Sequence, residues 1–523
     1  MSILLRPTAL IASGRQLFEG AEWDFEKLRR AYDAIEEIAA GELGLDTYPN
    51  QIEVITAEQM LDAYASIGLP LMYRHWSFGK RFAREESLYR HGLMGLAYEI
   101  VINSNPCISY IMEENSMAMQ TLVTAHAAFG HNHFFKNNYL FRQWTDAGGI
   151  LDYLAFARDF IAHAEERHGV EAVERVLDAA HALMDHGVHR YAKPPKLNLA
   201  EEGKREEERR RHFETHYDDV WRTALFSEEK PDNDAVAAAK KRAEVRKQLR
   251  LPEENLLYFI EKRAPRLEPW QRELVRIVRH ISQYFYPQKQ TKLMNEGCAT
   301  FVHYTIVNRL HEKGLISDGA LLEILHSHTS VVFQPEYDDP RYNGINPYAL
   351  GFAMMRDIKR ICTEPTDEDR EWFPDIAGNG DPYGTLRHAW ANYRDESFIL
   401  QYLSPRLMRE FRLFKVLDEE NAEALEVDAI HDARGFREMR NALSRHYDLA
   451  RHEPDIQVRD VDLAGDRCLV LTHAVHDGVT LDENQCKAVL NHVAELWRYG
   501  VRLEETDAIT DKVIKSHDEP PKR

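Results

Sequence analysis

The stretch MEENSMAMQTLVTAHAAFGHNHFFKNNY, residues Met112–Tyr139, predicts a helical body and a candidate site within it. It places His126, His131 and His133 close together, around Gly130. A straight helix would carry His126 and His131 to different faces, because five residues correspond to about 500° of rotation. We therefore expect the helix that carries His126 to end near Gly130, with the chain turning back to bring His131 alongside.

A distant segment, MNEGCATFVHY at Met294–Tyr304, supplies a carboxylate and another imidazole. Glu296 and His303 are seven residues apart, about 700° on a helix, so they share one face. Imidazoles and carboxylates are the ligands that zinc and similar divalent metals prefer. Because no strong ligand signature such as HExxH is present, two interpretations stay open. The segments form a metal site, or their polar side chains pair across buried helices without a metal.

His303 lies two helical turns beyond Glu296, about 10.5 Å along the axis. That distance is too long for both side chains to bind one ion on a straight helix. We therefore expect His303 to contact a metal ligand without binding the ion itself, or to transfer protons, since its pKa range suits either role. The alternative is a core histidine bonded to a backbone carbonyl.

Glu99 is a charged residue inside the apolar run MGLAYEIVINSNPCISYIMEEN, with Asn103 one helical turn further on. The pair Asn105–Pro106 breaks the pattern, because proline disfavours helix in the residue before it. A charge in an apolar surround needs a partner. Glu99 is thus either a site residue or half of a buried ion pair.

The composition is that of a globular protein, with 523 residues of which 44% are hydrophobic. A net charge of −20 argues against a main role in binding nucleic acid or anionic membranes. No run of about eighteen apolar residues predicts a membrane span, and the N-terminus lacks the features of a signal peptide. Five scattered cysteines without a CxxC pair indicate reduced thiols, so we expect a cytoplasmic protein.

Helical periodicity predicts a mainly α protein, with a large helical body over residues 1–425. Residues 192–250, which include the run EEGKREEERRRH, are expected to form a solvated charged insertion without site residues. Residues 426–515 are expected to form a small α+β domain, since strand patterns with turn signals precede a helix and a further strand. We see no chemistry there and expect a docking or oligomerisation module. Residues 516–523 are expected to be disordered.

Many long sequence motifs, which follow one another in a fixed order from about residue 20 onward, resemble those of the SpoVR family (stage V sporulation protein R-like). They include YPNQIEVITAEQMLDAYASIG, YRHWSFGK, AHAAFGHNHFFKNNYLF, LPEENLLYFIEK, NPYALG and RDESFILQYLSP. The resemblance implies a role in sporulation, in spore cortex formation, or in stress pathways. It also implies two partners, a PrkA-type serine protein kinase and a von Willebrand-type-domain protein. The family usually carries Trp after the NEG motif, where this chain has Cys298.

The run His–x–x–x–Gly–His, followed far downstream by Glu–Gly, also resembles the gluzincin-type metallopeptidases. That likeness implies a zinc-dependent hydrolase of peptide or amide bonds, with His126, His131 and Glu296 as metal ligands. Those enzymes place a catalytic glutamate directly after the first histidine, where this chain has Ala127. A base must then come from elsewhere, and the catalytic candidates are Glu99, Glu114 and His303. The alternative function is a catalytically silent scaffold that acts with the kinase.

Overall fold

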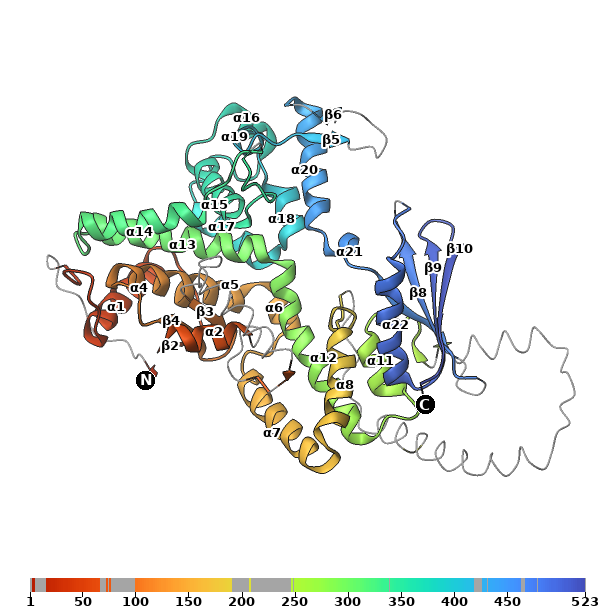
Figure 1. Ribbon diagram of the computed structural model, residues 1–523. Coiled ribbons are helices and arrows are strands. Elements are labelled where there is room, and N and C mark those ends of the chain that lie inside the picture. Colours follow the sequence, from red (N-terminus) through yellow and green to blue (C-terminus); the bar gives the residue numbers. More distant parts are fainter. Residues whose placement is uncertain are drawn as a thin grey trace, which may run out of the picture. The chain divides into compact units, whose positions relative to one another are not determined.

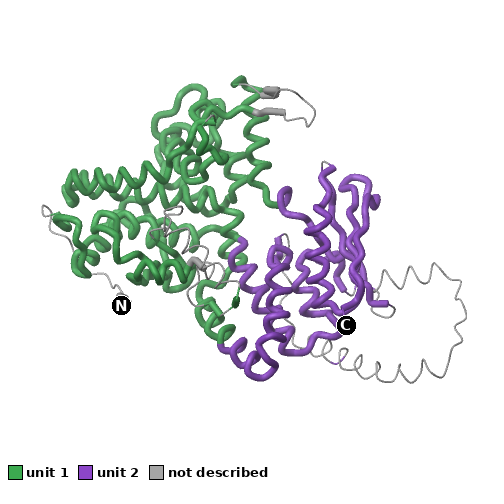
Figure 2. The backbone as a smooth tube through the Cα atoms, viewed as in Figure 1, with its two compact units in different colours: residues 1–158, 287–449 green, residues 159–286, 450–523 purple. Residues whose placement is uncertain are grey.

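The computed structural model describes residues 2–4, 16–65, 72–73, 75–76, 99–190, 207, 246–247, 249–337, 339–417, 426–429, 431–461, 466–476 and 478–522. The chain forms two compact units, each assembled from two separate segments (Figure 2). Unit 1 contains Met1–Arg158 and Pro287–Leu449, and unit 2 contains Asp159–Tyr286 and Ala450–Arg523. Helices dominate the described residues, which confirms the predicted mainly α class (Figure 1). None of these helices is long and apolar enough to cross a membrane.

Unit 1 is built around one long central helix, α13 (Lys292–Glu312), which is buried on nearly all sides. Such a helix is apolar around its circumference because neighbours cover every face. The helices of unit 1 around it are α1 (Phe25–Gly41), α2 (Ala57–Ala65), α4 (Met117–Thr124), η1 (Ala125–His131), α5 (Asn132–Asn137), α6 (Tyr139–Trp144), α14 (Asp318–Val331), α15 (Pro347–Thr363), α16 (Asp367–Trp372), α17 (Pro382–Asn392), α18 (Asp395–Tyr402), α19 (Pro405–Glu410) and α20 (Ala433–Tyr447). Of these, α15, η1, α1 and α14 make the most extensive contacts with α13, and α4, α5 and α18 also pack against it.

A four-stranded sheet accompanies the helices of unit 1. Its strands are β1 (Ser2–Leu4), β2 (Asn50–Ile55), β3 (Glu99–Ile102) and β4 (Cys107–Met112), in the order β1-β2-β4-β3. Strands β2 and β4 run parallel, and β3 pairs antiparallel with β4, with Glu99 opposite Ile111. The helical reading around Glu99 was therefore wrong. These short apolar runs are stabilised by pairing with each other, which periodicity within one run does not reveal. A further pair, β5 (Lys415–Leu417) and β6 (Glu426–Ala429), is antiparallel.

The start of α13 is fixed by a buried carboxylate from α18. Asp395 accepts hydrogen bonds from the backbone N–H groups of Leu293 and Met294, at 2.8 and 2.9 Å. These groups are among the N–H donors that a helix start leaves without partners. Glycines then let the neighbours of α13 approach closely. A Cβ atom on Gly297 would lie 2.7 Å from the backbone carbon of Gly351 on α15.

Unit 2 combines helices with a second four-stranded sheet, in the order β10-β9-β8-β7. Its strands are β7 (Ile456–Val461), β8 (Leu469–Val475), β9 (Val501–Asp507) and β10 (Val513–Glu519). Helix α22 (Glu483–Trp497) connects β8 to the parallel strand β9, while the outer pairs are antiparallel. Among the described residues, the other helices that lie wholly in unit 2 are α8 (Val170–Ala182), η2 (Met184–His186) and α11 (Leu256–Arg263). Three helices extend over a unit boundary or begin at one, namely α7 (Ile150–His168), α12 (Pro269–Gln290) and α21 (Leu449–His452).

The compact units divide the chain differently from the boundaries expected at residues 425 and 426. Helix α20 belongs to unit 1, whereas residues 159–286 join the C-terminal sheet in unit 2. Within the tail expected to be disordered, residues 516–519 form part of β10 and pair with β9. Backbone pairing along β9 orders this segment despite its polar composition. Nearly all of the charged insertion predicted at 192–250 lies outside the described residues.

Candidate metal centre

His126 and His131 lie on η1, a π-helical segment that joins α4 to α5 without a break. In a π-helix each N–H bonds to the carbonyl five residues earlier, as Asn132 does with Ala127. The extra residue in the turn brings side chains five apart onto one face. The expected chain reversal at Gly130 is therefore absent, and the wider turn replaces it.

Gly130 has a different role from the one that its place in the sequence indicated. A Cβ atom on Gly130 would lie 2.5 Å from the Cα atom of Ala299 on α13. Real Cβ atoms do not approach backbone carbon so closely, so only glycine allows η1 to rest directly on α13. This contact brings the two histidines of η1 beside Glu296, which is one turn before Ala299.

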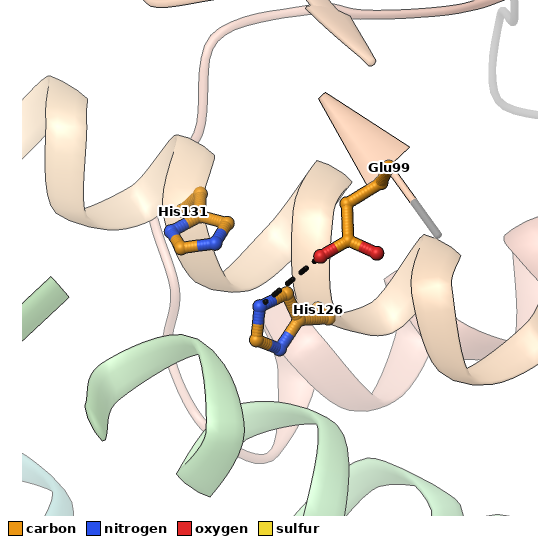
Figure 3. Close-up of side chains that lie close together, drawn as sticks. All are labelled: Glu99, His126 and His131. Carbon is orange, nitrogen blue, oxygen red and sulfur yellow. Dashed lines mark ion pairs between the residues drawn. The ribbon is translucent and has the colours of Figure 1, made fainter. Parts of the chain in front are cut away.

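The side chains of Glu99, His126 and His131 form a group that could hold a metal ion (Figure 3). One ligand atom from each lies within 4.8 Å of the other two. The His126 Nε2 atom lies 3.5 Å from Oε1 of Glu99. Glu296 approaches from α13, with its Oε2 atom 4.0 Å from His126 Nε2 and 3.7 Å from His131 Nε2.

These distances are longer than those of hydrogen-bonded pairs. An N–H···O hydrogen bond has a donor–acceptor distance of about 2.7–3.2 Å. Ligands bound at about 2.0–2.2 Å in a tetrahedron are about 3.4 Å apart. The three nitrogen–oxygen distances, 3.5, 3.7 and 4.0 Å, lie closer to the second value. The group of two imidazoles and a carboxylate could therefore hold a metal ion, with the second carboxylate, Glu296, close beside it.

In both His126 and His131, the Nδ1 atom, which is the ring nitrogen that does not face the carboxylates, has its own partner. His131 Nδ1 lies 2.9 Å from Oδ1 of Asn295, an oxygen that only accepts, so this nitrogen carries the proton. His126 Nδ1 lies 2.9 Å from Nδ1 of His303. With protons on both Nδ1 atoms, both Nε2 lone pairs are free to bind a metal. Outer partners of this kind fix the tautomer and the orientation of metal-binding histidines.

The hydrogen bonds continue from His126 through two further imidazoles. His303 Nε2 lies 3.0 Å from Nδ1 of His328, which is on α14. The row is satisfied when His126 donates to His303 and His303 donates to His328, and the reverse direction satisfies it equally. Burial lowers the pKa of His126 and His303 well below the usual value, and lowers the pKa of His328 to about 4. All three rings are thus neutral at pH 7, each with one proton.

The two carboxylates make the centre electrostatically unbalanced. Burial, followed by the nearby charge of Glu296, raises the pKa of Glu99 to about 8. Within the described part of the chain, neither carboxylate forms an ion pair with a lysine or arginine. Side-chain exposure is only 18% for Glu99 and 17% for Glu296. A divalent cation would offset the repulsion between these largely enclosed groups.

The structure brings together most of the residues singled out in the sequence. His126, His131 and Glu296 converge, Glu99 joins them from β3, and His303 lies behind His126. Their roles stay predictions. Glu114 is placed apart from this group: its side chain is exposed and accepts a bond of 3.3 Å from the backbone N–H of Ala57, at the start of α2.

His133 also has its partner outside this group. Two residues that contact the group were not singled out in the sequence. The backbone N–H of Asp46 donates to His133 Nδ1 at 2.9 Å. Sequence reasoning missed Asn295 and His328. Asn295 could have been found as the polar neighbour that directly precedes Glu296. His328 had no signal beyond its place in the run HSHTS.

Comparisons with known proteins cover nearly the whole chain. The family model described as SpoVR like protein matches residues 22–452, and the model described as SpoVR-like C-terminal domain matches residues 454–508. An uncharacterized protein of Escherichia coli (strain K12), YcgB, is 56% identical over 490 residues, which cover 94% of each chain. No solved structure matches the chain. The resemblance predicted from the sequence motifs is confirmed, and the chain belongs to the SpoVR family.

Proposed function

We propose that this chain is a metal-dependent hydrolase of peptide or amide bonds, with a zinc-like ion bound by His126, His131 and Glu296. The observation that carries the proposal is the spacing of their ligand atoms, which exceeds hydrogen-bond length and approaches the edge of a metal tetrahedron. The hydrogen bond from His131 to Asn295 supports it, because it leaves the Nε2 atom of His131 unprotonated, and the contact between His126 and His303 allows the same tautomer of His126.

Glu99 is the proposed general base. A bound divalent ion supplies a Lewis acid and lowers the pKa of a water ligand to about 7. Glu99 supplies the carboxylate that the gluzincin pattern would have placed at Ala127. Its Oε1 atom is 3.5 Å from His126 Nε2, so a water molecule bound beside His126 would lie within its reach.

Metal analysis of protein purified without a metal-binding tag tests the first half of the proposal. We expect one zinc-like ion per chain by elemental analysis. The variants His126→Ala, His131→Ala and Glu296→Gln should lose that ion, since each removes one of three ligands. The control His388→Ala changes an exposed histidine of α17 in the same unit and should retain it.

The variant Glu99→Gln separates a base from a ligand. As a base, Glu99 can be replaced with the ion retained, while hydrolysis of a peptide or amide substrate falls by about 10²–10⁴-fold. Loss of the ion from Glu99→Gln would instead show that both carboxylates bind it, giving a closed, structural site. Cell-wall peptides are the first substrates to examine, because the family name links the family to sporulation and so to spore cortex formation.

A protein that purifies without metal would favour the alternative function. The chain would then be a scaffold in a sporulation or stress pathway, acting with a PrkA-type serine kinase and a von Willebrand-type-domain protein. Co-purification with those partners would distinguish this function. In either case we place the protein in the cytoplasm, which is consistent with five cysteines that are all unpaired.

A further inference from the structure

A cavity of about 1010 Å³ lies in unit 1, between helix α15, helix α19 and the segment that follows α14. Its volume is at the upper end of the range of small-molecule sites, about 300–1,000 Å³. Buried residues of α15, among them Ala349 and Phe352, form part of its wall. The residues that line it are distinct from those of the metal centre.

Four arginines line this cavity, and two of them already have carboxylate partners. Arg412 forms an ion pair with Glu336, and Arg360 forms one with Asp357 at 2.8 Å. A ligand could recruit these two arginines only by breaking an ion pair. The other two arginines are therefore the groups through which the cavity can recognise a ligand.

Arg356 of α15 and Arg406 of α19 are both exposed, so a ligand in the cavity can reach them. Neither guanidinium group forms an ion pair or donates a hydrogen bond within the part of the chain that the structure describes. Arg356 lies over the ring of Phe352, 5.6 Å from its centroid, which leaves the N–H groups at its edge available. Glu410, the remaining carboxylate of the lining, is one turn from Arg406 but does not pair with it. The cavity thus offers two guanidinium groups that suit an anion.

A hydrogen bond between the two helices places both arginines on one wall. The hydroxyl of Ser404, which caps the start of α19, donates to Oδ2 of Asp357 at 2.6 Å. Arg356 directly precedes Asp357 on α15, and Arg406 follows Ser404 by two residues. The two guanidinium groups therefore approach the cavity from adjoining helices, as two donors to one phosphate require.

Open aromatic rings also line the cavity. The side chain of Tyr337 is 62% exposed and that of Phe414 is 45% exposed. Their ring centroids are 5.8 Å apart, and Tyr342 adds a third ring at 5.4 Å from Tyr337. A cluster of exposed apolar side chains marks an interaction site, and aromatic rings stack readily on a planar base.

We propose that this cavity binds an aromatic phosphate of the size of a mononucleotide. The phosphate accepts hydrogen bonds from Arg356 and Arg406, because a planar guanidinium matches the spacing of phosphate oxygens. The base stacks against the rings of Tyr337 and Phe414. The proposal does not depend on the hydrolase activity, since the two sites share no residue.

Isothermal titration calorimetry on the full chain tests the proposal with three probes. AMP carries both the base and the phosphate, adenosine lacks the phosphate, and ribose 5-phosphate lacks the base. We expect AMP to bind, and each of the other two to bind at least tenfold more weakly. Failure of AMP to bind, or an affinity no higher than that of either fragment, would overturn the proposal.

Three variants locate the bound AMP. Arg356→Gln and Arg406→Gln should each weaken AMP binding about tenfold, because each removes a charged donor from an exposed position that the fold does not need. Arg370→Gln is the matched control, since it removes the same charge from an exposed arginine of α16 that does not line the cavity, and it should leave AMP affinity unchanged. An equal loss in all three variants would mean that AMP responds only to overall charge. Unchanged affinity in Arg356→Gln and Arg406→Gln would place AMP elsewhere, and either outcome refutes the site.

Discussion

His303 is the residue whose position most constrains the chemistry of the centre. It contacts His126 through one nitrogen and His328 through the other, at 2.9 and 3.0 Å. Both of its ring nitrogens are thereby used within the protein, so neither is left for an ion. Its contact with the Nδ1 atom of His126, and not with Nε2, places it behind the metal-facing side of that ring.

Replacing His303 should therefore affect the ion less than replacing a ligand does. His303→Gln is expected to lower metal affinity by no more than about 10–100-fold, the usual effect of an outer partner. His126→Ala should lose the ion altogether. Titration of the metal-free proteins with zinc measures both. If the two variants lose metal equally, His303 binds the ion directly and its assignment here is wrong.

Spacing in the sequence reveals which residues meet, but not how. His126, His131 and Glu296 were grouped because their side-chain chemistry suits a metal, and that chemistry is independent of backbone detail. The π-helical turn that aligns the two histidines depends on contact with Ala299, which is far away in the sequence. The strand that carries Glu99 was missed because a short apolar run fits a strand or a helix equally, and only pairing with β4 decides.

At the scale of elements, the contact between η1 and α13 holds the centre together. Gly130→Ala would insert a methyl group 2.5 Å from the Cα atom of Ala299 and force the two helices apart. Overpacking of this kind costs about 1–3 kcal/mol. We expect a lower free energy of unfolding together with weaker metal binding, because the histidines move away from Glu296.

Gly41→Ala is the matched control for Gly130→Ala. Gly41 ends α1, and an added Cβ atom there would meet nothing within 4 Å. Alanine is the better helix former, so this variant should be neutral or more stable by up to about 1 kcal/mol. Denaturant unfolding compares the two. Equal stability of both variants would show that η1 and α13 can separate without cost.

A second element-scale prediction concerns Glu261 of α11, which is almost fully buried. Its carboxylate lies 2.9 Å from both Arg276 and Arg279 of α12. Burial alone would raise its pKa, but these guanidinium groups and Lys262 outweigh burial and lower the pKa to about 2. The unfolded chain binds the proton more readily, so the stabilisation is complete above about pH 4.5 and fades as the pH falls toward 2.

Glu261→Gln should accordingly destabilise the protein by about 3 kcal/mol at pH 7, since it leaves charged groups without their partner. The gap between variant and wild type should narrow below pH 4.5. Denaturant unfolding at pH 7 and at pH 4 measures it. A gap that stays constant or widens on acidification would mean that Glu261 is not stabilised in its charged form.

At the scale of the whole molecule, the C-terminal sheet does not stand alone within unit 2. The family model for the C-terminal domain begins at residue 454, yet the compact unit also includes residues 159–286. Phe259 of α11 packs on the buried Trp497 of α22, with ring centroids 5.9 Å apart. Glu253 extends the sheet by exchanging backbone hydrogen bonds with Val458 of β7, at 3.1 and 2.8 Å. Helix α8 also packs against α22.

The fragment 450–523 should therefore fail to fold cooperatively when expressed by itself. Without residues 159–286, Trp497 would lose an aromatic neighbour, and the Val458 edge of the sheet would present unpaired backbone groups. A fusion of 159–286 to 450–523 restores both contacts and should unfold in one sharp transition. Thermal unfolding followed by circular dichroism compares the two proteins. A cooperative transition in the fragment alone would show that the sheet and α22 suffice, and that the earlier helices merely pack against a finished domain.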